Sequence, residues 1–340
     1  MQGLKEKKVK KVVFFGTGGT ISGLSSESSD VLNYKPGLIG VSDLAQNAMS
    51  NASVQEEFEP VFEQIAQIDS KDMQFSIWAK LLERLLYWSK DEEVVGFLIT
   101  HGTDTVEETA FFLHLATMNL KSFPTIALTC AMRPASAVDA DGPQNLRDTT
   151  ALLLNPEWAQ SGVVVVCAGT VHHAKNVQKI YSDRLDAFSS LPSEPIGRFV
   201  QGILTKTSHE HGQEESDEPS IQLPSMNDLL LPKSWPWVEI VHNYTQSTGA
   251  CVNALLAYKK PSGATLSGLV VAGTGIGTVS EELSAALQTA KQIGVLVWQS
   301  SKCAFAQAKP KRDASFYDFH GLTPVKARIA LIMHLLANKL

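Results

Sequence analysis

Four short apolar runs rich in β-branched residues constrain the fold of this chain more than any other feature of its sequence. Each run is followed by glycine, threonine or another turn-forming residue, as expected of buried strands. Helical patterns lie between the runs, at residues 73–89 and 107–120. Strands that alternate with helices predict a layered α/β domain with a parallel sheet. The runs are residues 9–15, 94–100, 125–129 and 163–167.

A second alternating segment follows a polar stretch. Residues 205–225 are rich in acidic and histidine side chains and break the alternation, which predicts an exposed linker. We therefore expect an N-terminal α/β domain at residues 1–204, a linker at 205–233 and a C-terminal α/β domain at 234–340. In the second domain we predict strands at residues 238–242, 268–272 and 295–299, and helices at 250–259, 280–292 and 324–338.

Composition restricts the classes of partner. The chain has 340 residues, of which 44% are hydrophobic, enough to bury most of its apolar surface. Its net charge of -6 gives no overall positive field that would draw it to nucleic acid or to an anionic membrane. No stretch approaches the roughly 20 apolar residues of a membrane helix, and the apolar run near the start is too short for a signal peptide. We therefore expect a cytoplasmic protein that acts on a small molecule.

Cysteines and histidines give no metal signature. The cysteines lie far apart, without metal-ligand spacing or the density of a disulfide scaffold, which favours a reduced compartment. Neither His172 with His173 nor His209 with His211 has a carboxylate or thiol at ligand spacing, so we expect solvated loop histidines. The cysteines are Cys130, Cys167, Cys251 and Cys303.

Two loops that follow predicted strands carry the polar residues of greatest interest. Ligands of open α/β sheets bind beyond the carboxyl ends of the strands. Residues 16–20 have the sequence GTGGT, and residues 101–108 have the sequence HGTDTVEE. Their glycines allow bare N–H groups to approach a ligand, which suits either an oxyanion or a phosphate. The first loop lacks the spacing of known nucleotide loops, and we expect the GTGIG segment at 273–277 to be a structural turn.

A threonine hydroxyl in these loops needs a neighbouring base before it becomes a good nucleophile. A lysine screened from water beside Thr103 would accept a proton near neutral pH, with Asp104 orienting it. By composition alone, Lys179 is a solvated surface charge. We expect His101, next to this group, to be a packed or hydrogen-bonding residue.

The two loops together resemble the two signatures of bacterial-type L-asparaginases and glutaminase-asparaginases. The signature segments are residues 17–21 and 101–105, in this order and each after a predicted strand. The resemblance implies a larger N-terminal and a smaller C-terminal α/β domain. It also implies a homotetramer, a dimer of dimers, in which the partner's C-terminal domain completes each active site. Further matching segments are residues 68–73, 131–134, 140–146 and 322–328.

The resemblance implies a catalytic role for five residues. Thr20 matches the nucleophile, and Tyr34 matches the tyrosine that assists it from a mobile loop. Thr103, Asp104 and Lys179 match the second catalytic group, which replaces the composition-based interpretation of Lys179. The implied reaction is acyl transfer on L-asparagine or L-glutamine, with ammonia released and water cleaving the acyl-enzyme, and it needs no metal or organic cofactor. Direct attack by water activated at Thr103 is an alternative.

The implied substrate-binding residues include departures from the secreted enzymes. Ser70 matches the residue that holds the substrate α-carboxylate, and Asp104 matches the residue that takes its α-ammonium group. Lys71 stands where glutamine is frequent, and its charge would repel that ammonium unless the side chain points away. Gln246 stands where an asparagine is contributed across the dimer interface, and Asp313 is the candidate for the partner-subunit acid. The full implied set is Ser70, Lys71, Gly102, Thr103, Asp104 and Gln246.

Three other functions are weighed against this one. A nucleotide-binding module built on residues 16–20 would bind ATP or NAD without needing Thr20. An amidotransferase subunit acting for tRNA would carry an additional N-terminal domain, whereas only residues 1–8 precede the first predicted strand here. A catalytically dead binding protein is disfavoured because the matched side chains are all of reactive type.

Overall fold

In the computed structural model the chain divides into two units, residues 1–208 and residues 209–340. Each unit has its own mainly parallel sheet and its own buried apolar core. The predicted fold class, two α/β domains with mainly parallel sheets and a larger N-terminal domain, is confirmed. The structure describes residues 9–49, 58–207, 221–232, 234–305, 317–318 and 322–338.

An eight-stranded sheet forms the first unit, in the order β10-β9-β6-β5-β4-β3-β1-β2. Strands β2, β1, β3, β4 and β5 run parallel, and β6, β9 and β10 continue the sheet as antiparallel strands. All four predicted apolar runs are confirmed as buried parallel strands. The bounds are β1 (Lys10–Gly18), β2 (Phe58–Ile68), β3 (Val94–Thr100), β4 (Thr125–Thr129), β5 (Val163–Cys167), β6 (Thr170–His173), β9 (Gly197–Val200) and β10 (Ile203–Lys206).

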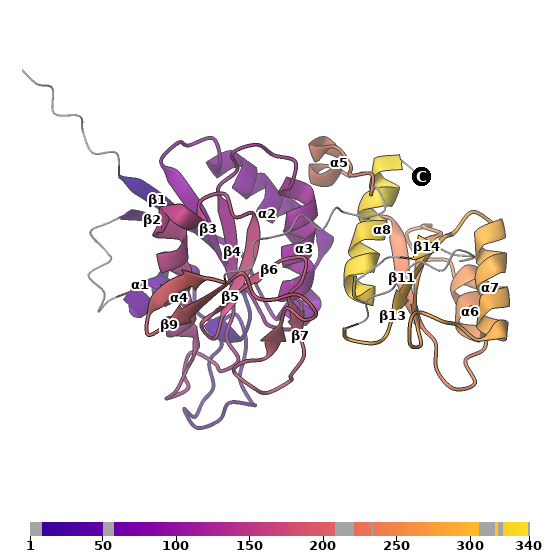
Figure 1. Cartoon of the computed structure of the whole chain (residues 1–340), viewed down its shortest axis with the longest axis horizontal. Coiled ribbons are helices and arrows are strands. Elements are labelled where there is room, and N and C mark those ends of the chain that lie inside the picture. Colours follow the sequence, from indigo (N-terminus) through magenta and orange to yellow (C-terminus); the bar gives the residue numbers. More distant parts are fainter. Residues whose placement is uncertain are drawn as a thin grey trace, which may run out of the picture. The chain divides into compact units, whose positions relative to one another are not determined.

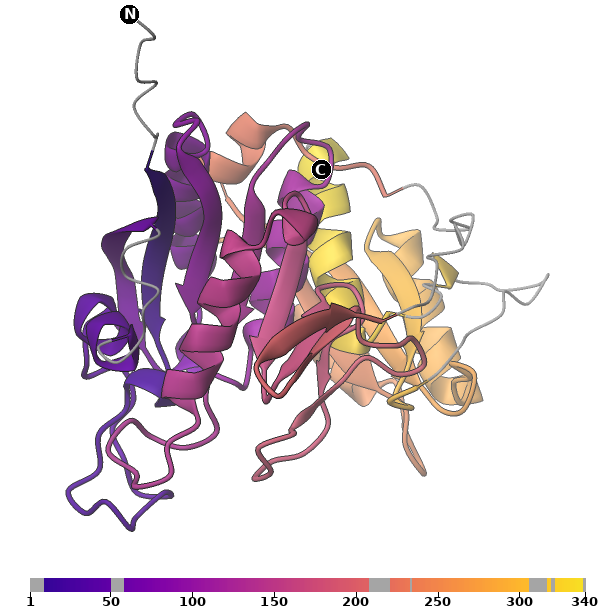
Figure 2. The ribbon, with the colours of Figure 1, turned by 60° about the vertical axis from the view of Figure 1, so that its left-hand side comes forward.

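Helices cover both faces of this sheet (Figure 1). In Figure 2, α4 crosses in front of the strands. Because successive side chains of a strand point to opposite faces, Val12 and Phe14 join a core shared with α1 and α4, while Phe15 stacks on Phe97 on the other face. Each such buried side chain contributes roughly 1.5–3 kcal/mol. The helices are α1 (Val41–Met49), α2 (Phe75–Trp88), α3 (Val106–Thr117) and α4 (Gly142–Leu154).

A four-stranded parallel sheet, in the order β11-β12-β13-β14, forms the second unit. Helices α6 and α7 pack together on one face, and α8 packs on the other. The strands and helices predicted here are confirmed to within two residues at either end. Their bounds are α5 (Met226–Leu230), β11 (Trp237–His242), α6 (Ala250–Ala257), β12 (Leu266–Gly273), α7 (Glu281–Gln292), β13 (Leu296–Ser301), β14 (Tyr317–Asp318) and α8 (Pro324–Asn338).

The segment expected to be a linker contains regular structure at both of its ends. Residues 205 and 206 are the last two of β10, which pairs with β9 across a turn at Gln201 and Gly202. Helix α5 also falls within residues 205–233. His209 and His211 lie outside the described residues.

The expectation of solvated loop histidines is wrong for His172 and His173. Both belong to β6, which folds back antiparallel onto β5 and pairs with Val165 and Val164. This pairing leaves His172 only 3% exposed, and its Nδ1 lies 2.8 Å from Ser190 Oγ. The sequence pattern missed a strand of four residues that contains two adjacent polar rings.

Candidate active site

The strand order brings the two predicted loops together. Strand β1 lies between β2 and β3, so the connections that follow β1 and β3 leave in opposite directions across the sheet. The carboxyl ends of these two strands form the topological switch point at which α/β sheets bind ligands. Residues 16–20 lie at the end of β1, and residues 101–104 follow the end of β3.

The backbones of the two loops are in direct contact at Gly19 and Gly102. Gly18 and Gly19 have φ values of 105° and 84°, and the Gly19 N–H donates to Ile68 O at 2.8 Å. A Cβ on Gly19 would lie 2.4 Å from the Cα and N of Gly102, and a Cβ on Gly102 would lie 2.5 Å from Ser70 Oγ. Only a residue without a side chain allows this approach. The residues that follow β1, β2 and β3 therefore meet in one place.

We expect Gly19→Ala to be strongly destabilising, because it combines backbone strain at positive φ with a clash against Gly102. Chemical denaturation should show a loss of roughly 3 kcal/mol or more. Gly202→Ala is the matched control: its φ is 77°, and a Cβ there has no heavy atom within 4 Å. The control should lose about 1–2 kcal/mol, the cost of the left-handed backbone alone. Equal losses in the two variants would show that the contact between the loops does not matter.

Thr20 is paired with Tyr34. Thr20 begins a 3-10 turn (Thr20–Ser22) directly after the two glycines, and it is 8% exposed. An antiparallel bridge between Leu24 and Lys35 folds the following segment back over this turn. The Oη of Tyr34 consequently lies 2.7 Å from Thr20 Oγ1, and either atom is able to donate. The Tyr34 oxygen therefore lies within hydrogen-bond distance of the proton that the Thr20 hydroxyl would lose.

Thr103, Asp104 and Lys179 form a second group. The Lys179 ammonium donates to Thr103 Oγ1 at 2.9 Å and to Asp104 Oδ1 at 2.6 Å. Lys179 lies in β7 (Gln178–Lys179), which pairs with β8 (Phe188–Ser189) and reaches back toward the end of β3. The lysine side chain is 17% exposed and the Asp104 side chain 55%. The structure thus places this lysine against the threonine, as the resemblance implied, and not in open solvent.

The residues expected to bind substrate are partly brought together. Ser70 is buried beside Gly102, and its carbonyl accepts a hydrogen bond from Thr105 Oγ1 at 2.7 Å. The Lys71 ammonium forms ion pairs with Asp69 and Asp72 of its own turn, so local carboxylates balance its charge.

The other two expected positions are not part of the first unit. Gln246 belongs to the second unit, where it has a φ of 59°. Asp313 lies outside the described residues.

His101 is the buried hydrogen-bonding residue that the sequence predicted. It is fully buried, and its Nδ1–H donates to Gly102 O at 2.8 Å. Its Nε2 accepts from Thr109 Oγ1 at 2.8 Å, and the Thr109 oxygen accepts from Trp78 Nε1 at 2.9 Å. Burial favours the neutral imidazole, which can make all of these bonds, and lowers the pKa of His101 from 6.5 to about 4.

This pKa predicts a loss of stability in mild acid. Above pH 6.5 the His101 imidazole is neutral in both the folded and the unfolded chain. As the pH falls from 6.5 to about 4, only the unfolded chain takes up the proton, so folding loses about 3 kcal/mol from this group. Denaturation of the wild type and of His101→Gln at pH 7.0 and at pH values near 4.5 should show a steeper loss in the wild type. Parallel losses would contradict the assignment.

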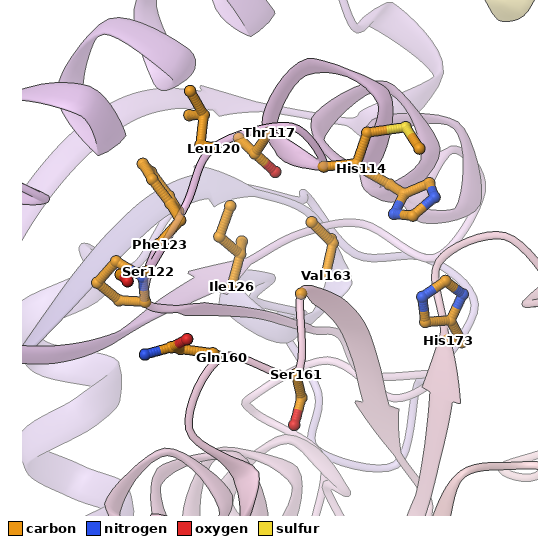
Figure 3. A pocket seen from close by; sticks show the side chains of 13 residues that line it. His114, Thr117, Leu120, Ser122, Phe123, Ile126, Gln160, Ser161, Val163 and His173 are labelled. Carbon is orange, nitrogen blue, oxygen red and sulfur yellow. The ribbon is translucent and has the colours of Figure 1, made fainter. Parts of the chain in front are cut away.

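The rest of the described structure contains a cavity, but neither a candidate metal site nor a membrane-spanning helix. A cavity of about 320 Å³ lies at the opposite edge of the sheet, near the amino ends of β4 and β5, with His114 and His173 among its lining residues (Figure 3). Across the residues described, no cluster of three or more His, Cys, Asp or Glu side chains is placed to hold a metal ion. None of the helices in those ranges is both long and apolar enough to cross a membrane.

Comparison with known proteins gives matches along nearly the whole chain. Residues 11–211 match the family model "Asparaginase, N-terminal", and residues 237–340 match the "Glutaminase/Asparaginase C-terminal domain". L-asparaginase 2 of Escherichia coli K12 is 31% identical over 333 residues, which cover 96% of this chain and 89% of that protein. The glutaminase-asparaginase of Pseudomonas fluorescens biotype A is 30% identical over 339 residues, with coverages of 96% and 87%. The crystal structure of a probable cytoplasmic L-asparaginase from Campylobacter jejuni superposes with a TM-score of 0.82 at 30% identity, covering 96% of this chain and 95% of that chain.

Proposed function

Because the chain belongs to the asparaginase family, we propose that it is an amidohydrolase that converts L-asparagine to L-aspartate and ammonia through an acyl-enzyme on Thr20. The observation that carries the proposal is the 2.7 Å contact between Thr20 Oγ1 and Tyr34 Oη, at the switch point of the larger sheet. It gives a threonine hydroxyl both a proton acceptor and a place where substrates of α/β proteins bind.

The proposed reaction has two stages. The Thr20 oxygen forms a bond to the side-chain amide carbon, the carbon–nitrogen bond breaks, and the nitrogen takes up a proton and leaves as ammonia. Water then adds to the ester, the bond to Thr20 breaks, and the proton returns to the hydroxyl. In the tetrahedral intermediates of both stages, backbone N–H groups beside Thr103 would hold the oxyanion.

The second group supports the reaction from the other loop. Lys179 donates to Thr103 and to Asp104, so a positive charge lies next to a hydroxyl and a carboxylate at the end of β3. We assign Asp104 to the substrate α-ammonium and buried Ser70 to its α-carboxylate. The ion pairs of Lys71 with Asp69 and Asp72 balance its charge locally, which supports a place for the ammonium beside Asp104.

Two substrates that differ in the length of their amide side chain, L-asparagine and L-glutamine, suit the proposed reaction. The relatives include both L-asparaginases and glutaminase-asparaginases. Gln246 has a longer side chain than the asparagine that the resemblance places there, and this change bears directly on the length of amide that fits. A glutaminase-asparaginase of broader specificity is therefore the second candidate function.

The experiment that tests the proposal measures ammonia release from L-asparagine, L-glutamine and D-asparagine. We expect L-asparagine to give the highest kcat/KM. A higher kcat/KM for L-glutamine would favour the broader enzyme, and no release from any of the three would overturn the proposal. Binding of ATP or NAD, measured by calorimetry on the same preparation, is not expected.

We further propose that the chain acts in the cytoplasm as a homotetramer, a dimer of dimers, in which residues 234–340 of one subunit complete the site on residues 1–204 of its partner. The likeness to a protein titled as a probable cytoplasmic L-asparaginase supports the location. Light scattering at micromolar concentration should give a tetramer or dimer, and a monomer at that concentration would contradict the shared site.

A further inference from the structure

Two buried cysteines meet where β4 and β5 end. These strands are parallel neighbours, with Thr129 opposite Val166, so Cys130, the residue directly after β4, comes beside Cys167, the last residue of β5. Both thiols are reduced, 1% and 4% exposed, and in hydrogen-bonding contact with each other. Two cysteines that are far apart in the sequence are therefore side by side in the fold.

The surroundings make the two thiols unequal. His172, on the neighbouring strand β6, hydrogen-bonds to Cys167 and is itself held by Ser190 at 2.8 Å. The hydrogen bond from Cys130 and the one from His172 lower the pKa of Cys167 below the usual value for a thiol, against the effect of burial. The pKa of Cys130 is raised, because the same contact and its burial both favour its protonated form. Cys167 is thus the better nucleophile, and Cys130 keeps its proton.

This pair is also joined to the proposed active site. Asn145 of α4 donates from Nδ2 to Cys130 O at 2.9 Å and accepts on Oδ1 from Ala168 N at 3.0 Å, which ties the two strand ends together. The Lys179 charge is close enough to act on the Cys130 thiol. After Cys167 the chain turns tightly at Ala168 and Gly169, both at positive φ, and continues through β6 to Lys179.

We propose that Cys130 and Cys167 are a site of reversible oxidation, which a hydroperoxide closes to a disulfide and a small thiol reopens, and that closing it inactivates the enzyme. The claim about activity rests on the function proposed above, whereas the claim about the disulfide does not. The argument rests on the register of β4 with β5, the contact between the thiols and the position of His172 beside Cys167.

The chemistry balances with the hydroperoxide as oxidant. The Cys167 thiolate attacks the peroxide, the O–O bond breaks, and Cys167 becomes a sulfenic acid while hydroxide or alkoxide leaves and is protonated. The Cys130 sulfur then displaces the hydroxyl group from Cys167, forming the S–S bond and releasing water. Reduction follows by two successive exchanges with an external thiol.

The backbone geometry allows a disulfide between Cys130 and Cys167, and forming it would displace residues of the proposed active site. Parallel neighbours are about 4.8 Å apart, within the roughly 4.4–6.8 Å between Cα atoms that disulfides span. An S–S bond of about 2 Å is shorter than any hydrogen-bonded contact between thiols, so the sulfurs must move toward each other. The Cys167 thiol would also lose its bond from His172. Through the tight turn at Ala168 this displacement reaches the segment that carries Lys179.

The test uses the full chain carrying Cys251→Ser and Cys303→Ser, which removes the two exposed cysteines. After treatment with hydrogen peroxide, peptide mass mapping should find Cys130 linked to Cys167. Ammonia release should fall roughly 10-fold to 100-fold relative to the reduced sample, as expected for a displacement of about 1 Å at catalytic groups. Dithiothreitol should restore both the free thiols and the activity.

The control adds Cys130→Ala, which leaves Cys167 without a partner and should prevent recovery of the linked peptide. If the alanine variant folds poorly, mass mapping of the chain with all four cysteines still shows whether Cys130 is linked to Cys167 after peroxide treatment. Free thiols at both positions after peroxide treatment would overturn the proposal, and so would a mapped disulfide with unchanged ammonia release. A chain that releases no ammonia even when reduced would refute the proposed function, while the mapping would still decide whether the disulfide forms.

Discussion

Replacing Thr20 with valine is expected to abolish ammonia release from L-asparagine, with kcat lower by roughly 10³-fold or more. Valine keeps the branched shape of threonine in a position that is 8% exposed but removes the oxygen that lies 2.7 Å from Tyr34. The acyl-enzyme then has no atom on which to form. Steady-state kinetics over a range of asparagine concentrations should show the loss in kcat, since the proposed contacts to the substrate termini are unchanged.

The comparison for this result is Thr20→Ser, which retains the hydroxyl and should keep a measurable part of the activity. Rapid quenching of the wild type with asparagine, followed by mass mapping, should place the acyl group on the peptide that contains Thr20. If Thr20→Val released ammonia at the wild-type rate, the acyl-enzyme would be ruled out, and direct attack by water activated at Thr103 would be favoured.

Replacing Lys179 with methionine should lower kcat by roughly 10²-fold to 10⁴-fold. Methionine is similar in length and unbranched, so it fills much the same space while removing the donor to Thr103 and the positive charge beside Asp104. Asp104 then carries a charge without its partner, next to the proposed position of the substrate. Activity measurements with saturating asparagine test the size of the effect.

Two further variants show whether the loss of activity comes from the hydrogen bond between Lys179 and Thr103. Lys175→Met removes the same charge four residues earlier and should leave kcat near the wild-type value. In a double-mutant cycle with Thr103→Val, the double variant should be about as slow as the slower single variant, because both changes disable one hydrogen-bonded group. Fully additive losses would mean that Lys179 acts independently of Thr103.

The parts of the fold that could be predicted from sequence are those buried on both faces. Strands β3, β4 and β5 are short runs of apolar side chains, and the structure gives them the predicted bounds. Strand β2 could not be found in this way, because it pairs only with β1 at an edge and mixes glutamate, glutamine and proline with its apolar residues. The strands from β6 to β10 have two to four residues each, too few for a periodic pattern.

The candidate site divides in the same way. The glycine-rich loops could be placed at strand ends from sequence alone, since turn residues follow each apolar run. Lys179 could not, because it reaches Thr103 through a two-stranded hairpin that no local pattern predicts, and it entered through the resemblance. The contact between Cys130 and Cys167 depends on the register of β4 with β5, which is a property of the sheet.

The bare-backbone contact between Gly19 and Gly102 has a consequence for protein engineering. A library that varies the two loops independently would consist mostly of clones in which a new side chain separates them, whatever it adds to recognition. Directed evolution of amide selectivity should therefore hold both glycines constant and randomise positions such as Lys71 and Gln246. The Lys71 side chain is not among the atoms nearest to Gly19 or Gly102, so we expect substitutions of Lys71 to leave this contact intact.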